Sequence, residues 1–496
     1  MQIEPECFTI EDYLHHTFSC ECGRSHHTDV EKILISQGAL ERVPEAVEEL
    51  GYHHVFLVSD YNTYQAAGER VEKLLRDRNQ ACTSYVITRK IVVPDEHTLA
   101  ELLVHFNPEC DLIIGVGTGT INDMCKFLSY QMKMEYMIIA SAPSMDGFAS
   151  VGAALIVNNL KTTYNAHVPK AIIGDVDILA KAPMNMIAAG VADILGKYTC
   201  LCDWHLSNLV NGEYFCPVIE RMVRYSLKKM MEQVKNLKER TPETIQTVME
   251  SLVLTGIAMS FVGNSRPASG CEHHMSHYWE MKFLFEGRPA VLHGTKVGVG
   301  TMTAIRLYQK FMESEIDYEE AVRRAEAFDF AEWSENMKRT YGAAADGVIA
   351  NEKTEQKNDP EEVKKRLVVI REKMGDIRRT VSDLVPQEAL IRGILKDLEA
   401  PVNPLELGID CGMVSDSIEV AKEVRDRYTL LQLLWDLGIL KTVSEVTAAS
   451  FQKVMEKLSG IDGWRTDMLS VLMMELFSLG YCSLRWYADQ MPAKRC

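Results

Sequence analysis

Short apolar runs alternate with amphipathic helical stretches through the first third of the chain. Runs rich in β-branched residues occur at His54–Asp60, Ser84–Thr88, Asp111–Gly115 and Tyr136–Ser141. Helical patterns at Thr63–Arg78 and Asp95–Phe106 lie between them. Such alternation predicts a parallel, doubly wound sheet with helices on its faces. We expect two further strands, Ala153–Val157 and Ala171–Asp175, to complete the sheet.

After Pro183 only helical periodicity remains. The pattern predicts helices at Ala188–Asn208, Pro217–Lys238, Pro242–Val262, Gly270–Phe285, Thr295–Met312 and Tyr318–Tyr341, with further charged helices after them. A chain of 496 residues also exceeds what one hydrophobic core usually supports. We therefore predict an α/β N-terminal, Rossmann-like parallel-sheet domain (residues 1–183) followed by an all-α C-terminal domain (residues 184–496).

Composition excludes several classes of partner. The net charge is −17 and no Lys/Arg-rich run is present, so the long-range field repels nucleic acid and anionic membranes. We find no apolar stretch of about eighteen residues and no signal-peptide pattern at the N-terminus. Thirteen scattered cysteines, an odd number, indicate reduced thiols. The sequence predicts a soluble, cytoplasmic protein with no nucleic-acid or membrane partner.

The segment Gly270–Gly300 carries a cluster of histidines. If this segment is helical to about Phe285, His273 and His277 lie one turn apart on one face, and His293 opens the next helix. Asp193 interrupts an otherwise small and apolar helix face, where an unpaired carboxylate is costly. Any one of these histidines is best explained as an ordinary polar residue, but the cluster favours a divalent-metal site and therefore an enzyme.

A glycine-rich turn follows the run that ends at Ile114. Its residues Gly117, Thr118, Gly119, Thr120 and Ile121 lead into a predicted helix, where backbone amides could approach a diphosphate. A tight strand-to-helix turn without a ligand explains the pattern nearly as well. Asp60, at the end of an earlier strand, could accept hydrogen bonds from a ribose or cap the following helix.

A third loop collects small hydroxyl residues and a carboxylate. Ser141, Ser144, Asp146 and Ser150 follow a predicted strand, where they could line a cofactor or polyol site. Ser and Asp beside Pro and Gly are equally typical of an ordinary turn. Lys161 and Lys170, between the strands predicted at Ala153–Val157 and Ala171–Asp175, are available as cations.

Together these residues resemble the iron-type alcohol dehydrogenase superfamily, which includes glycerol dehydrogenase and dehydroquinate synthase. Within it, the chain is most similar to the sn-glycerol-1-phosphate dehydrogenase branch, with its bacterial AraM-type members. The stretch from Gly117 to Asp123 stands where the superfamily has its GGGxxxD turn, with Thr118 in place of the middle glycine. The resemblance covers roughly residues 10–300 and returns around residues 426–438. It implies a dehydroquinate synthase-like arrangement of the two domains.

The resemblance also implies a reaction and a site. The reaction is the interconversion of dihydroxyacetone phosphate and sn-glycerol 1-phosphate with NAD or NADP, and we expect a homo-oligomer. One divalent metal, Zn²⁺ or Ni²⁺, would be held by Asp193, His273 and His293. Asp146, Asp193 and His277 would contact the phosphorylated substrate, and His277 is counted with the three metal ligands as catalytic. The predicted dinucleotide contacts are Asp60, Gly117, Thr118, Gly119, Thr120, Ile121, Ser141, Ser144 and Ser150.

Some assignments stay open. The substrate phosphate needs cations, for which we nominate Arg266, Lys161 and Lys296. Asp60 favours NAD if its carboxylate accepts from the ribose 2′-hydroxyl, because a 2′-phosphate would be repelled. Three alternative functions are a glycerol dehydrogenase without a phosphate pocket, a dehydroquinate synthase-like lyase and a non-enzymatic regulator. Asp193 counts against the lyase, which usually has Glu there, and the complete ligand set counts against the regulator.

Two segments lie outside this scheme. Cys20 and Cys22 resemble half of a zinc ribbon, but no second matching cysteine pair follows, so we expect no structural metal there. Residues 440–496 form a helical extension not typical of the superfamily. Its apolar face from Met468 to Leu479 could pack against a partner or a second subunit, although packing within the chain is the stronger expectation.

Overall fold

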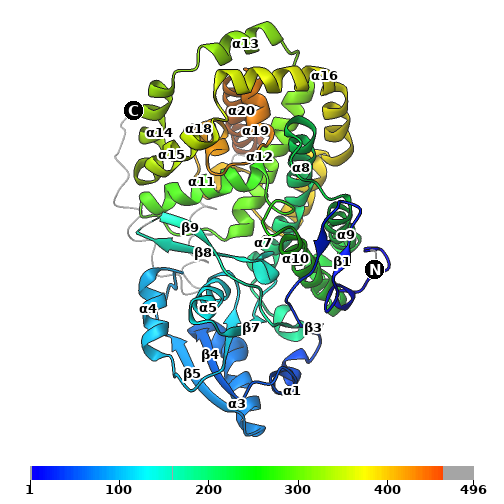
Figure 1. The fold of residues 1–496 in the computed structure, drawn as a ribbon, viewed down its shortest axis with the longest axis vertical. Coiled ribbons are helices and arrows are strands. Elements are labelled where there is room, and N and C mark those ends of the chain that lie inside the picture. Colours follow the sequence, from blue (N-terminus) through cyan, green and yellow to red (C-terminus); the bar gives the residue numbers. More distant parts are fainter. Residues whose placement is uncertain (1–2, 159, 462–496) are drawn as a thin grey trace.

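A computed structural model describes residues 3–158 and 160–461 of the chain. Its centre is a six-stranded parallel sheet with strand order β3-β10-β7-β6-β4-β5 (Figure 1). The strands are β3 Lys32–Ser36, β4 His54–Asp60, β5 Ala81–Ile87, β6 Leu112–Gly117, β7 Glu135–Ala140 and β10 Ala171–Asp175. The predicted parallel sheet is confirmed, with β3 as an additional edge strand that the sequence pattern did not identify.

The central strands are apolar along their length because helices cover both faces of the sheet. All six residues of β6 are buried, as are Tyr136 to Ala140 of β7. Parallel pairing also brings the carboxyl ends of the strands to one edge of the sheet. That edge therefore carries Asp60 at the end of β4, Gly117 at the end of β6 and Ser141 directly after β7.

Helices α1 Val43–Glu49, α3 Glu69–Asp77, α4 Glu96–His105 and α5 Gly119–Met132 connect the strands. Asp95 caps α4 by accepting a hydrogen bond from the Thr98 amide at 2.8 Å. The predicted single helix from Thr63 to Arg78 is wrong in detail. One turn of α2, Tyr61–Thr63, leads into a π-helical segment, η3 Tyr64–Gly68, before α3 begins.

The strand expected at Ala153–Val157 exists but does not join the sheet. β8 Gly152–Val157 pairs antiparallel with β9 Leu160–Asn165 in a separate hairpin, which packs against helix α11 (Figure 1). The polar sequence of β9 explains the difference, since Lys, Thr and Asn side chains cannot be buried on both faces of a covered parallel sheet. Only β10 completes the sheet as predicted.

From Val176 onward the described residues form helices and connecting loops only. The predicted helix Ala188–Asn208 is two helices, α7 Met184–Leu195 and α8 Lys197–Asn211, which meet at Gly196. The predicted helix Tyr318–Tyr341 is also two, α13 Tyr318–Glu326 and α14 Phe330–Tyr341, because Asp329 caps a new helix. The others are α9 Pro217–Gln233, α10 Pro242–Val262, α11 Cys271–Phe285, α12 His293–Glu313, α15 Ala345–Glu355, α16 Pro360–Leu384, α17 Glu388–Asp397, α18 Cys411–Val420 and α19 Leu430–Asp436.

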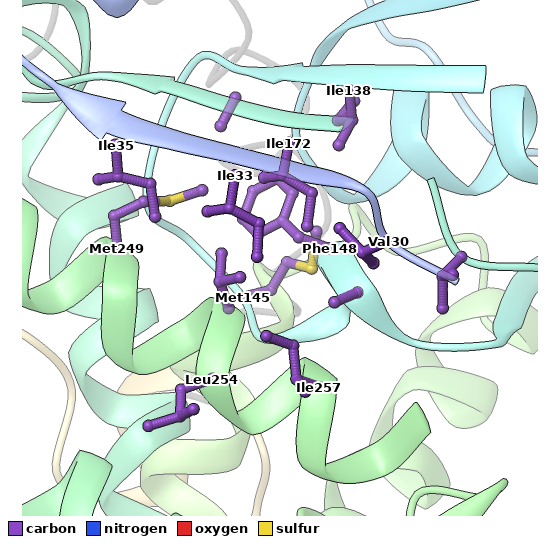
Figure 2. Packing of buried hydrophobic residues seen from close by; sticks show 14 of the residues in the cluster. Val30, Ile33, Ile35, Ile138, Met145, Phe148, Ile172, Met249, Leu254 and Ile257 are labelled. Atoms are coloured by element: carbon purple, nitrogen blue, oxygen red, sulfur yellow. The ribbon is translucent and has the colours of Figure 1, made fainter. Parts of the chain in front are cut away.

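Helix α10 packs against the sheet and joins the two parts of the structure. Figure 2 shows Met249 of this helix beside Ile35 of the sheet, with Ile257 farther along the same helix. Its length and composition would suffice to cross a membrane, contrary to the expectation that the chain has no such stretch. Because 72% of its most apolar window is buried inside the protein, α10 is a core helix.

The two ends of the described chain both pack on the helical region. A short hairpin, β1 Phe18–Ser19 and β2 Ser25–His26, lies beside α9 and α10 (Figure 1). At the other end, α20 Leu440–Ile461 packs against α18 and α12. Leu440, Val443 and Phe451 are buried there, so this part of the extension packs within the chain. The apolar segment from Met468 to Leu479 lies outside the described residues.

Candidate active site

Three helices bring the predicted metal ligands together. Asp193 lies in α7, His273 in the first turn of α11, and His293 is the first residue of α12. One carboxylate oxygen and one nitrogen of each imidazole all lie within 4.8 Å of one another. A catalytic zinc site usually has three protein ligands of this kind and an open fourth coordination position.

Two glycines allow these helices to approach so closely. A Cβ atom at Gly190 of α7 would lie 1.9 Å from the Pro143 carbonyl oxygen. A Cβ atom at Gly294 of α12 would lie 1.9 Å from the Ala189 carbonyl oxygen. Helix α7 therefore lies directly against the loop that follows β7 on one side and against the start of α12 on the other.

A buried ammonium group lies between two carboxylates of the site. Lys197 Nζ donates to Asp193 Oδ1 at 2.9 Å and lies 2.6 Å from Asp146 Oδ2. Burial alone would raise the pKa of the Asp193 carboxyl, but Lys197 and His273 hold that pKa below its usual range. Burial and the neighbouring Asp193 charge raise the pKa of Asp146. Asp193 is therefore ionised, as a metal ligand must be.

Glu272 orients the first histidine of the cluster. Its Oε1 lies 2.8 Å from His273 Nδ1 and accepts the Gly270 amide at 2.7 Å, while Oε2 accepts the Thr199 hydroxyl at 2.7 Å. Nδ1 of the imidazole is thus occupied, and Nε2 faces Asp193 Oδ1 at 3.6 Å. A carboxylate behind a histidine ligand fixes its tautomer and strengthens it as a ligand.

His277 lies beside the other two imidazoles, as its spacing predicts. Its ring centroid is 6.2 Å from that of His273 and 5.8 Å from that of His293. Glu280 Oε2 lies 3.7 Å from His277 Nδ1. Burial, together with the charges of Arg425 and Lys161, lowers the pKa of His277 to about 3, so the imidazole is neutral at physiological pH.

The glycine-rich turn joins the end of β6 to helix α5. Thr118 precedes α5, and its carbonyl accepts the Asn122 amide at 2.8 Å. A Cβ atom at Gly117 would lie 2.6 Å from Ile121 Cβ, so only glycine allows the turn to close this tightly. The first amides of a helix have no partner within that helix. Such a helix start can therefore hold an anionic group.

The serine-containing loop lies next to this turn. The Ser141 amide donates to the Gly117 carbonyl at 3.1 Å, and Ser144 is buried. The Ser150 hydroxyl accepts a hydrogen bond from Lys126 Nζ at 3.1 Å, and Lys126 also donates to the Gly147 carbonyl at 3.0 Å. Burial lowers the pKa of Lys126 to about 8. The sequence analysis missed Lys126, whose place three residues after Asp123 on an apolar helix face was the available signal.

Asp60 is a helix cap in this structure. Its Oδ1 accepts the Thr63 amide at 2.9 Å, and the Thr63 hydroxyl accepts the Asp60 amide at 3.0 Å. Of the two roles that the sequence left open, the structure contains the cap. The second carboxylate oxygen stays available at the carboxyl end of β4.

Comparison with known proteins identifies the family. The model of the iron-containing alcohol dehydrogenases matches residues 34–183. A curated glycerol-1-phosphate dehydrogenase of Halalkalibacterium halodurans, whose name gives NAD(P)⁺, is 32% identical over 419 residues, which are 84% of this chain and 95% of that one. An enzyme of the same name from Methanosarcina mazei is 32% identical over 277 residues, 56% of this chain and 76% of its own length. The chain belongs to the glycerol-1-phosphate dehydrogenase family.

Solved structures agree on the fold of this glycerol-1-phosphate dehydrogenase family member. A glycerol dehydrogenase from Schizosaccharomyces pombe aligns with a TM-score of 0.54 at 14% identity, over 86% of this chain and 92% of that one. A maleylacetate reductase from Rhizobium also has a TM-score of 0.54, at 11% identity, over 85% of this chain and 98% of that one. The predicted fold class, a parallel-sheet domain followed by a helical region, is that of these two enzymes.

Four basic side chains of this family member are candidates to bind a substrate phosphate, and they differ in their partners. Arg266 is buried and its Nη2 donates to Glu213 Oε2 at 2.9 Å and to the Tyr428 carbonyl at 2.7 Å, so it fastens the scaffold. Lys161 and Lys296 both lie against Glu280 Oε1, at 2.7 and 3.1 Å. Arg425, which the sequence analysis missed, donates to the Thr163 hydroxyl at 3.2 Å. Among the described residues it has no carboxylate partner, and no local sequence pattern marked it.

Proposed function

We propose that this chain is an NAD(P)-dependent, metal-dependent sn-glycerol-1-phosphate dehydrogenase. The reaction interconverts dihydroxyacetone phosphate and sn-glycerol 1-phosphate by hydride transfer at C2. One observation carries the proposal: Asp193, His273 and His293 converge within 4.8 Å beside the loop that also contacts the glycine-rich turn. The names of the curated relatives agree with this reaction.

The donor set fits a divalent cation. One carboxylate and two imidazoles are the oxygen and nitrogen ligands that Zn²⁺ or Ni²⁺ accepts, and we assign the ion to Asp193, His273 and His293. When bound, such an ion is a Lewis acid that stabilises negative charge developing on the substrate oxygen. Glu272 holds the His273 ring so that Nε2 faces Asp193. Lys197 holds the carboxylates of Asp193 and Asp146 in place.

The dinucleotide would lie along the carboxyl edge of the sheet. The turn of Gly117 and Thr118 and the amides of Gly119, Thr120 and Ile121 form a helix start suited to a diphosphate. Ser141, Ser144 and Ser150 would line the nicotinamide side of this edge. The remaining oxygen of Asp60 would accept from a ribose hydroxyl, which favours NAD over NADP.

Surplus cations near His277 favour a phosphorylated substrate. Lys161 and Lys296 share one carboxylate, Glu280, so one positive charge is not balanced within this group. Arg425 adds a second charge from the segment before α19. Because the whole chain carries a net charge of −17, a dianionic substrate requires such a local positive site. We assign the phosphate to Lys161, Lys296 and Arg425.

His277 is the residue that we assign to proton transfer. Its imidazole is neutral, so it can accept a proton from, or relay one to, the C2 oxygen. Glu280, 3.7 Å from Nδ1, would orient the ring. Asp146, held by Lys197, would position the terminal hydroxyl of the substrate.

The same metal and dinucleotide residues would also serve a glycerol dehydrogenase. The cations around Glu280 favour the phosphorylated substrate over the unphosphorylated one. A dehydroquinate synthase-like lyase is less well supported, because Asp193 occupies the position where that branch usually has Glu. We further propose that the enzyme is cytoplasmic, acts on this small molecule without nucleic acid or membrane, and is a homo-oligomer.

The test compares substrates on one preparation. Protein stripped of metal and reloaded with Zn²⁺ or Ni²⁺ is mixed with NADH or NADPH and either dihydroxyacetone phosphate or dihydroxyacetone, and cofactor absorbance is followed. We expect metal-dependent oxidation with the phosphorylated ketone only. His273→Ala should abolish it, whereas His205→Ala, on the partly exposed part of α8, should not. Turnover of dihydroxyacetone alone would establish a glycerol dehydrogenase, and turnover of neither would refute the proposal.

A further inference from the structure

The N-terminal hairpin and the residue before α9 bring three cysteines and one histidine together. Cys20 and Cys22 lie in the turn between β1 and β2, and His26 lies in β2. Cys216, the residue before α9, comes from a part of the chain 190 residues beyond His26. Their three sulfurs and one imidazole nitrogen all lie within 4.8 Å of one another.

The spacing of these donors is that of a tetrahedral metal site. Cys20 Sγ lies 3.5 Å from Cys216 Sγ, and His26 Nε2 lies 3.3 Å from Cys22 Sγ and 3.6 Å from Cys216 Sγ. A zinc ion about 2.3 Å from sulfur and about 2.0 Å from nitrogen places its ligand atoms roughly 3.5 to 3.8 Å apart. These three distances are close to the spacing that one ion requires, and the remaining pairs lie within the 4.8 Å that spans the cluster.

Hydrogen bonds with neighbouring groups orient His26, Cys22 and Cys216 within the cluster. His26 Nδ1 lies 3.1 Å from the Phe261 carbonyl oxygen, so Nδ1 carries the hydrogen and the lone pair of Nε2 faces the sulfurs. The His26 ring also stacks on Phe261, with centroids 5.8 Å apart. Backbone amides of Arg24 and Ile219 hydrogen-bond to the sulfurs of Cys22 and Cys216 and fix their positions. His26 and Cys216 are buried, which protects the site from solvent.

The backbone from Cys20 to Arg24 forms a tight turn. The Cys20 amide donates to the Arg24 carbonyl and the Gly23 amide to the Cys20 carbonyl, both at 3.0 Å. Gly23 adopts a φ of 83°, which a residue with a Cβ rarely does. This turn presents the sulfurs of Cys20 and Cys22 on the same side, toward α9.

We propose that Cys20, Cys22, His26 and Cys216 bind a structural Zn²⁺ that clamps the N-terminal hairpin to α9 and α10. This Cys₃His set shares no residue with the candidate active site and requires no particular enzymatic function. The sequence argument against a metal here rested on the lack of a second cysteine pair. The fold supplies two further ligands, His26 from β2 and Cys216 from the residue before α9, and the second of these is too distant in sequence for any local spacing to reveal.

Metal counting tests the proposal on the full chain. Protein from zinc-supplemented growth, purified without chelator and analysed by mass spectrometry of metals, should hold one metal more per chain than Cys22→Ser. The matched control is Cys7→Ser, an exposed cysteine of the same N-terminal segment, which should keep the wild-type content. His273→Ala should lose the other metal and retain this one. Equal metal content in Cys22→Ser and Cys7→Ser would overturn the proposal.

Cobalt substitution provides a test that needs no variant to fold. Wild-type protein reloaded with Co²⁺ should show a thiolate-to-cobalt charge-transfer band, which a site of Asp and His ligands cannot give. Absence of the charge-transfer band would contradict the proposal. So would a Cys20–Cys216 disulfide, detected as a pair of cysteines protected from alkylation in the denatured, metal-free protein.

Discussion

Individual side chains that contact the proposed metal ligands fix the positions of those ligands in the candidate site. Lys197 and Glu272 are both fully buried, and each contacts one ligand with a full set of hydrogen bonds. Neither residue is among the proposed metal ligands, but each restricts the orientation of one of them. Charged groups are costly to bury unless they are paired, so their presence here indicates a positioning role.

Replacing Glu272 should weaken the metal site without unfolding the protein. In Glu272→Gln the amide keeps the volume but loses the charge that strengthens His273 as a ligand. We expect metal affinity to fall by about 10–100-fold. Competition with a chromophoric chelator measures this, with Glu220→Gln on α9 as a control that should retain wild-type affinity. Equal affinity in the two variants would refute the positioning role.

Removing Arg425 should affect only the phosphorylated substrate. In Arg425→Ala we expect the KM for dihydroxyacetone phosphate to rise by about tenfold or more, since a charge-assisted hydrogen bond contributes roughly 1.5–3 kcal/mol. The kcat should change less, and Arg425→Lys should restore part of the affinity. Steady-state kinetics with Arg379→Ala, an exposed arginine of α16, as control would check this. An unchanged KM would place the phosphate elsewhere.

The sequence predicted most site residues but not their supports. His273, His277 and His293 were predictable because helical spacing and one turn are local properties. Asp193 was predictable because a carboxylate on an apolar helix face needs a partner. Arg425 and Cys216 were not, since they reach their neighbours from 262 and 190 residues away, at Thr163 and His26. Only tertiary contacts bring such pairs together.

Pairs of packed elements hold the site as much as single residues do. α7 contacts both α12 and the loop after β7 through backbone atoms, at Gly294 and Gly190. The β8–β9 hairpin, whose first strand was wrongly expected in the sheet, carries Lys161 and Thr163 toward the helical region. The existence and type of elements followed from periodicity, whereas hairpin partners and helix breaks such as Gly196 depended on packing that periodicity does not encode.

A methyl group at Gly190 should disrupt the contact between α7 and the loop. In Gly190→Ala the new Cβ would lie 1.9 Å from the Pro143 carbonyl, so the helix must shift, and we expect a loss of about 1–3 kcal/mol in stability together with weaker metal binding. Gly375→Ala in α16 is the matched control. Its Cβ would meet no atom within 4 Å, so we expect a gain of about 0.5–1 kcal/mol. Thermal unfolding distinguishes the two, and equal destabilisation would contradict the packing argument.

At the scale of the whole molecule, the N-terminal segment packs on the helical region, although the sequence analysis assigned it to the sheet-containing domain. The division into residues 1–183 and 184–496 stays a prediction, and the hairpin of β1 and β2 lies across it, on α9 and α10. If zinc clamps this hairpin, Cys216→Ser should accelerate amide hydrogen exchange in residues 3–26. Exchange in β6 and α5 should stay at the wild-type rate. Unchanged exchange in the hairpin would show that apolar packing alone holds it.

The most direct test of the proposed function is the identity of the product. The metal-loaded enzyme is allowed to consume dihydroxyacetone phosphate and NADH to completion, and the product is offered to a reference dehydrogenase specific for sn-glycerol 3-phosphate. We predict stoichiometric NADH oxidation and a glycerol phosphate that the reference enzyme cannot oxidise, as expected for sn-glycerol 1-phosphate. A product that the reference enzyme oxidises, or no consumption of NADH or NADPH, would contradict the assignment.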